Sequence, residues 1–185
     1  MDKIKILGIS GSLRKESFHT KLLKVITKMS VEGAEIETAD ISNLPLFNQD
    51  FETNPPEAVT AFKKKIKESD AILFVSPEYN YSVPGALKNA IDWASRPYGD
   101  NSFDGKTAAI ISGSIGILGG SRMQYHLRQS FVFLNMRPLN RPEVMIPMIQ
   151  DKFDASGNIT DAPTKEKVEE MINALVSWTK EMKTK

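Results

Sequence analysis

Residues Ala71–Trp93 read AILFVSPEYNYSVPGALKNAIDW, and this stretch decides the fold. Its first six residues form a short apolar run that is typical of a buried strand. After Pro84, apolar residues recur at helical spacing: Leu87, Ala90, Ile91 and Ala94. A helix is therefore predicted to start near Pro84. The polar, aromatic loop between strand and helix follows the carboxyl end of the strand, where open α/β sheets bind ligands. Glu78, Tyr79 and Asn80 are thus candidates for ligand contact.

The rest of the chain alternates between strand and helix patterns. Strands are predicted at Lys3–Ser10, Glu35–Asp40, Ala71–Ser76 and Thr107–Ser112, with a fifth within Leu139–Ile146. Helices are predicted around His19–Ile26, at Glu57–Glu68, after Pro84, at Arg122–Leu134 and at Thr164–Lys183. Such alternation predicts a parallel sheet with right-handed crossovers. Five units of this length favour a flavodoxin-like three-layer α/β sandwich with a five-stranded parallel sheet in the order 2-1-3-4-5. We expect one domain over residues 1–185.

Composition narrows the class of protein. Of 185 residues, 41% are hydrophobic and 25% are charged, which is typical of a globular protein. The net charge of +1 gives no reason to expect a nucleic-acid partner. No apolar run approaches the length of a membrane span, and the first residues lead directly into a strand rather than a signal peptide. We therefore expect a cytoplasmic protein with no membrane insertion.

Cysteine is missing from the sequence altogether. This excludes disulfides, thiol nucleophiles, cysteine-ligated iron–sulfur clusters and thiolate zinc sites. The only two histidines, His19 and His126, are far apart in the sequence, so no metal site is expected either.

A second motif, GISGSLRKES, spans Gly8–Ser17 directly after the first strand. A loop of glycine and serine that opens a helix presents backbone N–H groups and hydroxyls to an anion. Arg14 adds a cation that can bind phosphate in a bidentate way. The alternative is an ordinary strand-to-helix turn capped by serine. The convergence of these groups on one turn favours a phosphate site.

The spacing in this loop excludes several kinds of phosphate or catalytic site. It lacks the G-x-x-x-x-G-K-[ST] pattern of a triphosphate loop and the G-x-G-x-x-G pattern of a dinucleotide turn. The nucleophile elbow G-x-S-x-G also fails, because Ser12 stands where its closing glycine belongs. In the order 2-1-3-4-5, the loops after strands one and three flank the crevice that holds FMN. An FMN phosphate is therefore the best fit.

Three stretches, GSLRKESF, PEYNYSVPGALKNAIDW and the segment Gly116–Gln129, resemble the NADPH-dependent FMN reductase family, and most of all its quinone and chromate reductase branch. The resemblance implies that the first loop wraps the FMN phosphate through Ser12, Arg14, Ser17, Phe18 and His19. It further implies that Pro77, Glu78, Tyr79 and Asn80 lie against the isoalloxazine ring, and that Ser114 is another cofactor-binding residue.

The family resemblance also implies an activity. It predicts an FMN-dependent oxidoreductase that passes hydride from NADPH or NADH, by a ping-pong mechanism, to a quinone, chromate, azo dye or flavin. No protein side chain is then required as a catalytic acid, base or nucleophile, because the flavin carries the chemistry. A homodimer or homotetramer is expected. The alternatives are a flavodoxin-like electron carrier without nicotinamide turnover and a phosphate-binding regulator without flavin.

Some residues allow two interpretations from the sequence. The family commonly has Asn where this chain has His19, which either contacts the phosphate or packs on its helix beside Leu22. We favour contact, because the position opens the helix. Glu78 is predicted to hydrogen-bond, to pair with an arginine at a subunit contact, or to face solvent. Arg122 and Arg128 are predicted to be surface or interface charges.

Overall fold

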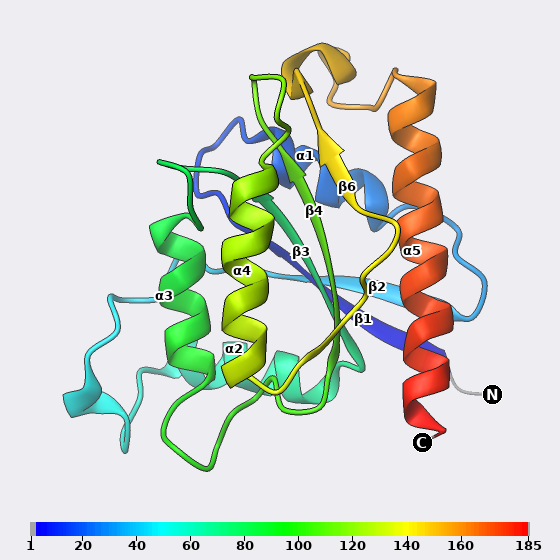
Figure 1. Cartoon of the computed structure of the whole chain (residues 1–185). Coiled ribbons are helices and arrows are strands. Elements are labelled where there is room, and N and C mark those ends of the chain that lie inside the picture. Colours follow the sequence, from blue (N-terminus) through cyan, green and yellow to red (C-terminus); the bar gives the residue numbers. More distant parts are fainter. Residues whose placement is uncertain (1–2, 185) are drawn as a thin grey trace.

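A computed structural model of the chain describes residues 3–184, which form one parallel sheet with helices on both faces (Figure 1). The strands are β1 (Ile4–Ser10), β2 (Ala34–Ala39), β3 (Ala71–Pro77), β4 (Thr107–Gly113), β5 (Arg137–Pro138) and β6 (Val144–Ile146). The α-helices are α1 (Phe18–Ile26), α2 (Glu57–Glu68), α3 (Gly85–Ala94), α4 (Ser121–Phe133) and α5 (Ala162–Lys183). Two short 3₁₀ helices are η1 (Gln49–Phe51) and η2 (Ile149–Lys152).

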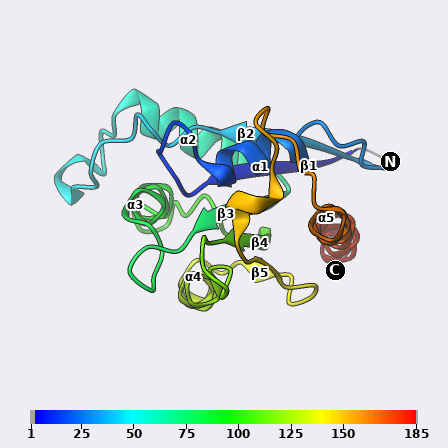
Figure 2. The same cartoon turned by 90° about the horizontal axis from the view of Figure 1, so that it is seen from above.

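The sheet has the predicted order. Its strands run β2-β1-β3-β4-β5, and each neighbouring pair is parallel. The flavodoxin-like α/β fold predicted from the sequence is thereby confirmed. The carboxyl ends of β1, β3 and β4 consequently lie next to one another at one edge of the sheet, which Figure 2 shows from above.

The predicted fifth strand is wrong in one respect, because two short strands occupy its place. β5 pairs with the start of β4 at Thr107 and Ala108, whereas β6 pairs with its end at Ile111–Gly113. Between them, the guanidinium of Arg128 donates to the Leu139 carbonyl at 3.0 Å, and Pro142 has no N–H to give to a ladder. The segment between β5 and β6 therefore leaves the sheet, and six strands result.

The two faces of the sheet have separate cores. One core joins the sheet to α2, α3 and α4, with Phe62, Leu87 and Leu127 as members from these helices. The other joins it to α1 and α5, with Leu22 and Ile172 among its members. Figures 1 and 2 show the resulting three layers. β3 and β4 lie between both cores and are buried along their whole length.

Side-chain caps fix where α1 and α5 begin. Ser17 accepts the N–H of Thr20 at the start of α1, and Asp161 accepts the N–H of Thr164 at the start of α5. The N-terminus of α1 follows the carboxyl end of β1 in the chain. Within residues 3–184, no helix combines the length and the apolar character needed to cross a membrane.

Candidate functional site

The loops after β1 and β3 are packed closely together. The N–H of Gly11 donates to the Val75 carbonyl at 2.9 Å. A Cβ atom at Gly11 would lie only 2.1 Å from Oγ of Ser76, which is completely buried. Glycine is therefore required here so that the first loop can pass directly over the end of β3. The two predicted motifs thus meet at one edge of the sheet.

The loop from Ser12 to the first turn of α1 is built to accept an anion. Oγ of Ser12 accepts the Arg14 N–H at 3.3 Å, and Oγ of Ser17 accepts the Thr20 N–H at 3.3 Å. Within residues 3–184, the N–H groups of Phe18 and His19 have no hydrogen-bond acceptor. Free N–H groups at the positive end of a helix, beside hydroxyls and an arginine, match the donor set that a phosphate needs.

Phe18 connects this loop to a distant part of the chain. Its ring stacks on Phe153 with the ring centroids 5.8 Å apart. The Arg14 guanidinium lies 5.5 Å from the ring centroid, and the Lys21 ammonium lies 5.7 Å from it. Both distances fall in the range of cation–π contacts. Phe18 therefore supports the cations around the loop and ties it to the segment that follows η2.

His19 is buried, with only 5% of its surface exposed. Its Nε2 lies 3.2 Å from the Gly113 carbonyl at the end of β4, so this nitrogen is the donor. Burial lowers the pKa of His19 to about 4, and the ring is neutral at pH 7. The other ring nitrogen is then an acceptor, which does not bond to phosphate. This arrangement favours the packing interpretation of His19 over contact between a cationic ring and phosphate.

The loop after β3 is a two-residue hairpin. Tyr79 and Ser82 exchange both backbone hydrogen bonds, at 3.1 and 2.9 Å. Between them Asn80 and Tyr81 have φ values of 49° and 66°, as a type I′ turn requires. Asn tolerates this left-handed backbone, whereas Tyr adopts it only when its surroundings impose it. The rings of Tyr79 and Tyr81 are both exposed at the tip.

Contacts with α4 hold this hairpin in place. The Glu78 carboxylate pairs with the Arg122 guanidinium, with N–O distances of 2.6 and 2.7 Å, and accepts the Met123 N–H at 3.1 Å. The hydrogen bond that Arg122 donates to Glu78 raises the pKa of Arg122. The same guanidinium lies 3.5 Å from the centroid of the Tyr81 ring, a cation–π contact. We call this set of contacts the hairpin clamp: Glu78, Tyr81, Arg122 and Met123.

The hairpin clamp sharpens the predictions for Glu78 and Arg122. Glu78 pairs with an arginine of its own chain, and its carboxylate covers the N-terminus of α4, where negative charge is favourable. Arg122 was expected to be a surface or interface charge, yet it fixes a loop of the site. The two residues are 44 positions apart, so no local sequence signal indicates the contact.

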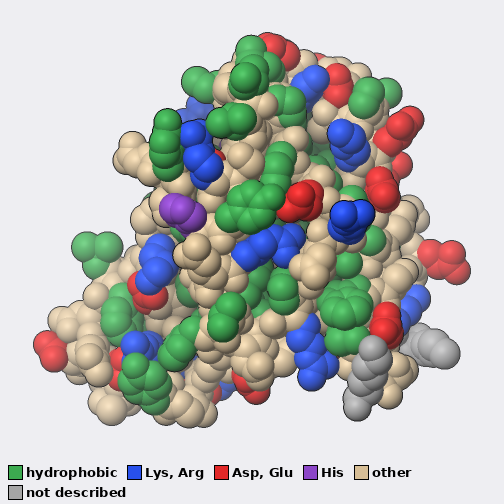
Figure 3. All heavy atoms as spheres, in the orientation of Figure 1, with side chains coloured by type: hydrophobic (Ala, Val, Ile, Leu, Met, Phe, Trp, Pro, Cys, Tyr) green, Lys and Arg blue, Asp and Glu red, His purple; other side chains and the backbone are tan. Residues whose placement is uncertain are grey.

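The loop after β4 supplies the third wall. Ser114 donates from its hydroxyl to the Gly116 carbonyl at 3.0 Å and from its N–H to the Ile146 carbonyl at 3.1 Å. The following apolar side chains are at least half exposed: Ile115, Ile117 and Leu118. Figure 3 shows hydrophobic side chains gathered at the end of the molecule where β4 ends. The site therefore combines a loop with free N–H groups and an apolar rim.

The structure thus places the predicted site residues on three adjacent strand ends. Ser12, Arg14, Ser17, Phe18 and His19 follow β1; Pro77, Glu78, Tyr79 and Asn80 end or follow β3; and Ser114 follows β4. Over residues 3–184, no cluster of three or more His, Asp or Glu side chains is arranged to hold a metal ion. The geometry is that of a flavodoxin-like protein with free N–H groups at the start of α1 and an exposed apolar rim after β4.

Comparison with known proteins identifies the family of this chain. The sequence model of the NADPH-dependent FMN reductase family matches residues 4–151. The chain is 48% identical over 183 residues to an NAD(P)H-dependent FMN reductase of Pseudomonas aeruginosa, covering 98% of both chains. It is 51% identical over 183 residues to an NADPH:quinone oxidoreductase of Arabidopsis thaliana, covering 95% of this chain and 92% of the relative.

A solved structure agrees with these relatives. FerB, a flavoenzyme NAD(P)H:(acceptor) oxidoreductase from Paracoccus denitrificans, superposes with a TM-score of 0.89 at 37% identity, covering 97% of this chain and 98% of FerB. The chain therefore belongs to the NADPH-dependent FMN reductase family, as its sequence motifs indicated. It is an oxidoreductase whose cofactor is FMN and whose reductant is NAD(P)H.

Proposed function

We propose that this enzyme is an NAD(P)H:quinone reductase that works by a ping-pong mechanism. The observation that carries the proposal is the exposed apolar rim of Ile115, Ile117 and Leu118 beside the phosphate loop, which suits a flat, apolar acceptor. The similarity to the Arabidopsis NADPH:quinone oxidoreductase supports the same acceptor class. Chromate, an azo dye or free flavin are the alternative acceptors.

The residues of the site have binding roles in this proposal. When bound, FMN supplies a ring that accepts hydride from NAD(P)H and gives it to the acceptor. Ser12, Arg14, Ser17 and the free N–H groups at the start of α1 hold its phosphate. The remaining predicted contacts, Phe18, Pro77, Tyr79, Asn80 and Ser114, line the space beside them.

Glu78 and His19 act differently from these residues. The Glu78 carboxylate is occupied by Arg122 and Met123, so it positions the hairpin instead of offering a free acceptor to a ligand. His19 holds the Gly113 carbonyl through Nε2 and so fixes the position from which Ser114 starts. Neither residue exchanges a proton with substrate in this proposal, and the catalytic step uses no acid or base from the chain.

A steady-state assay tests the reductase proposal. The FMN-loaded protein is given NADPH or NADH with a benzoquinone, and initial rates are measured over a grid of both substrate concentrations. A ping-pong reductase gives parallel double-reciprocal lines. Intersecting lines would contradict the ping-pong mechanism. Bound FMN without acceptor-dependent turnover would favour the electron carrier instead, and protein that takes up no FMN would favour the phosphate-binding regulator.

We further propose that the enzyme assembles as a homodimer or homotetramer in the cytoplasm. Support for assembly comes from an exposed apolar face of α4. Val132 and Phe133 follow Tyr125 by seven and eight residues, so the three side chains lie on one side of the helix. Tyr125 is 54% exposed, Val132 84% and Phe133 63%. We also propose that the chain forms a single domain, because strands β1 to β6 all belong to one sheet.

A further inference from the structure

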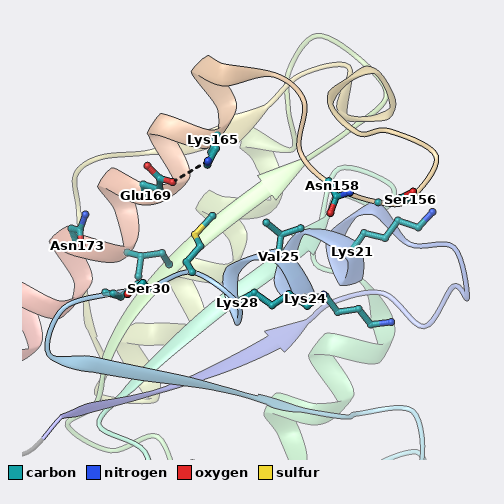
Figure 4. Close-up of a pocket in the computed structure, with 14 residues that line it drawn as sticks. Lys21, Lys24, Val25, Lys28, Ser30, Ser156, Asn158, Lys165, Glu169 and Asn173 are labelled. Atoms are coloured by element: carbon teal, nitrogen blue, oxygen red, sulfur yellow. Dashed lines mark ion pairs between the residues drawn. The ribbon is translucent and has the colours of Figure 1, made fainter.

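A cavity lies in a groove between α1 and α5 (Figure 4). Its volume is about 710 Å³, within the range of small-molecule sites. Figure 4 shows α1 on one side and α5 on the other, with the segment that carries Ser156 and Asn158 across one end. We call this cavity the α1–α5 groove.

Positive charge surrounds the α1–α5 groove. Four lysines line it: Lys21, Lys24, Lys28 and Lys165. The only acid among its lining residues, Glu169, is held by Lys165 at 3.9 Å, as the dashed line in Figure 4 shows. Lys21 pairs with Glu16 at 2.7 Å. Within residues 3–184, Lys24 and Lys28 have no ion-pair partner, so two cations at the groove remain uncompensated.

The floor of the groove is apolar. Val25 and Met29 come from α1 and the turn that follows it, and Ile172 comes from α5. Ile172 is completely buried in the core between the sheet and both helices, and the partly buried Met29 packs against the same core. Methionine adapts its shape to different apolar groups. A ligand that satisfies both the walls and the floor needs an anionic head and an apolar body.

We propose that the α1–α5 groove binds a small organic anion with one carboxylate head and an aliphatic body. The carboxylate pairs with Lys24 and Lys28, and the aliphatic chain covers Val25 and Met29, which lie above the buried Ile172.

The loop from Ser12 to Ser17 does not line this groove, but it lies nearby. The Lys21 ammonium is 5.7 Å from the centroid of the Phe18 ring, and Lys24 also lines a second cavity together with Ser12 and Arg14.

Calorimetric titration of the FMN-loaded enzyme with decanoate tests this proposal. Below the micelle concentration, decanoate binds once per chain, and excess FMN leaves the binding unchanged. Decanol, which has the same chain without the charge, binds more weakly. Binding of decanoate weakens as NaCl concentration rises. In the variant with Lys24→Gln and Lys28→Gln, affinity falls by about fivefold to tenfold, the effect of losing two partly exposed ion pairs.

A matched variant controls for the loss of charge. Lys64→Gln with Lys167→Gln removes the same charge from exposed positions that do not line the groove, and it keeps wild-type affinity. Both double variants keep quinone reductase turnover. The proposal is overturned if decanoate does not bind, if FMN displaces it, or if the two double variants bind it equally well.

Discussion

At the scale of single residues, Gly11 and Gly85 differ in the space that the fold leaves them. A Cβ at Gly11 would clash with the buried Ser76 hydroxyl, which itself donates to the Pro77 carbonyl at 3.0 Å and cannot easily move. At Gly85, the first residue of α3, nothing lies within 4 Å of a Cβ. The two positions therefore form a matched pair for testing the junction between β1 and β3.

We predict opposite effects for alanine at these glycines. Gly11→Ala lowers the free energy of unfolding by about 1–3 kcal/mol, the usual cost of overpacking, and weakens FMN binding. Gly85→Ala leaves stability unchanged or raises it by up to about 1 kcal/mol, because alanine favours the helix. Urea unfolding and FMN titration measure both. Equal stability and FMN affinity in the two variants would contradict the close packing described at Gly11.

The buried His19 predicts how stability depends on pH. Its pKa falls from 6.5 in the unfolded chain to about 4 in the fold, so the unfolded chain binds more protons between these values. The stabilisation is fully present above pH 6.5 and is lost as pH falls towards 4, by about 3 kcal/mol in all. Urea unfolding of wild type and His19→Gln from pH 4 to 7 measures it. The prediction fails if both proteins lose stability equally over this range.

The same residue gives a second prediction for FMN binding. Because neutral His19 donates to Gly113, it adds no titrating cation at the phosphate between pH 5.5 and 8. Wild type and His19→Gln therefore show the same pH dependence of FMN affinity, measured by flavin fluorescence quenching. A steeper loss of affinity with rising pH in wild type would instead support a contact between protonated His19 and the FMN phosphate.

Contacts between distant residues carry no local sequence signal at this scale. The loop of Ser12, Arg14 and Ser17 could be predicted because its donors are neighbours in the chain. The partner of His19 is 94 residues away, and only the fold shows that Gly113 takes its Nε2 hydrogen.

At the scale of elements, the hairpin clamp joins the β3 loop to the first turn of α4. We predict that Glu78→Gln weakens FMN affinity by about tenfold, because charge-assisted hydrogen bonds that fix the hairpin are lost. Asp92→Asn removes the exposed Lys88–Asp92 pair of α3, whose N–O distance is 2.6 Å, and leaves FMN affinity unchanged. FMN titration compares the two. Similar effects in both variants would argue against a positioning role for Glu78.

Element boundaries followed from the sequence wherever local signals were strong. The helix predicted at Glu57–Glu68 has those bounds in the structure, and the helix predicted at Thr164–Lys183 begins two residues earlier, at Ala162, after its cap Asp161. The fifth strand was harder to predict, because its apolar pattern does not indicate that Arg128 donates a hydrogen bond to the Leu139 carbonyl. A contact from another helix divides that strand, and local periodicity does not contain such contacts.

At the scale of the whole molecule, the exposed face of α4 predicts how copies assemble. Val132→Glu with Phe133→Glu places two charges on this face, so we expect the assembly to dissociate. Lys167→Glu, on the far side of the sheet on α5, leaves it intact. Light scattering after gel filtration gives the mass of each variant. A wild-type monomer, or an unchanged mass for the α4 variant, would overturn this prediction.

The division of the outer strand into β5 and β6 also bears on how the protein behaves when crowded at high concentration. An unbroken strand at the border of a sheet offers a row of free N–H and C=O groups, on which another chain can build a fibril. Here the border beside β4 consists of a two-residue and a three-residue piece, and one of them contains Pro138. Neither is long enough to template growth, so the segment that leaves the sheet protects this border, whereas the opposite border is the unbroken six-residue strand β2.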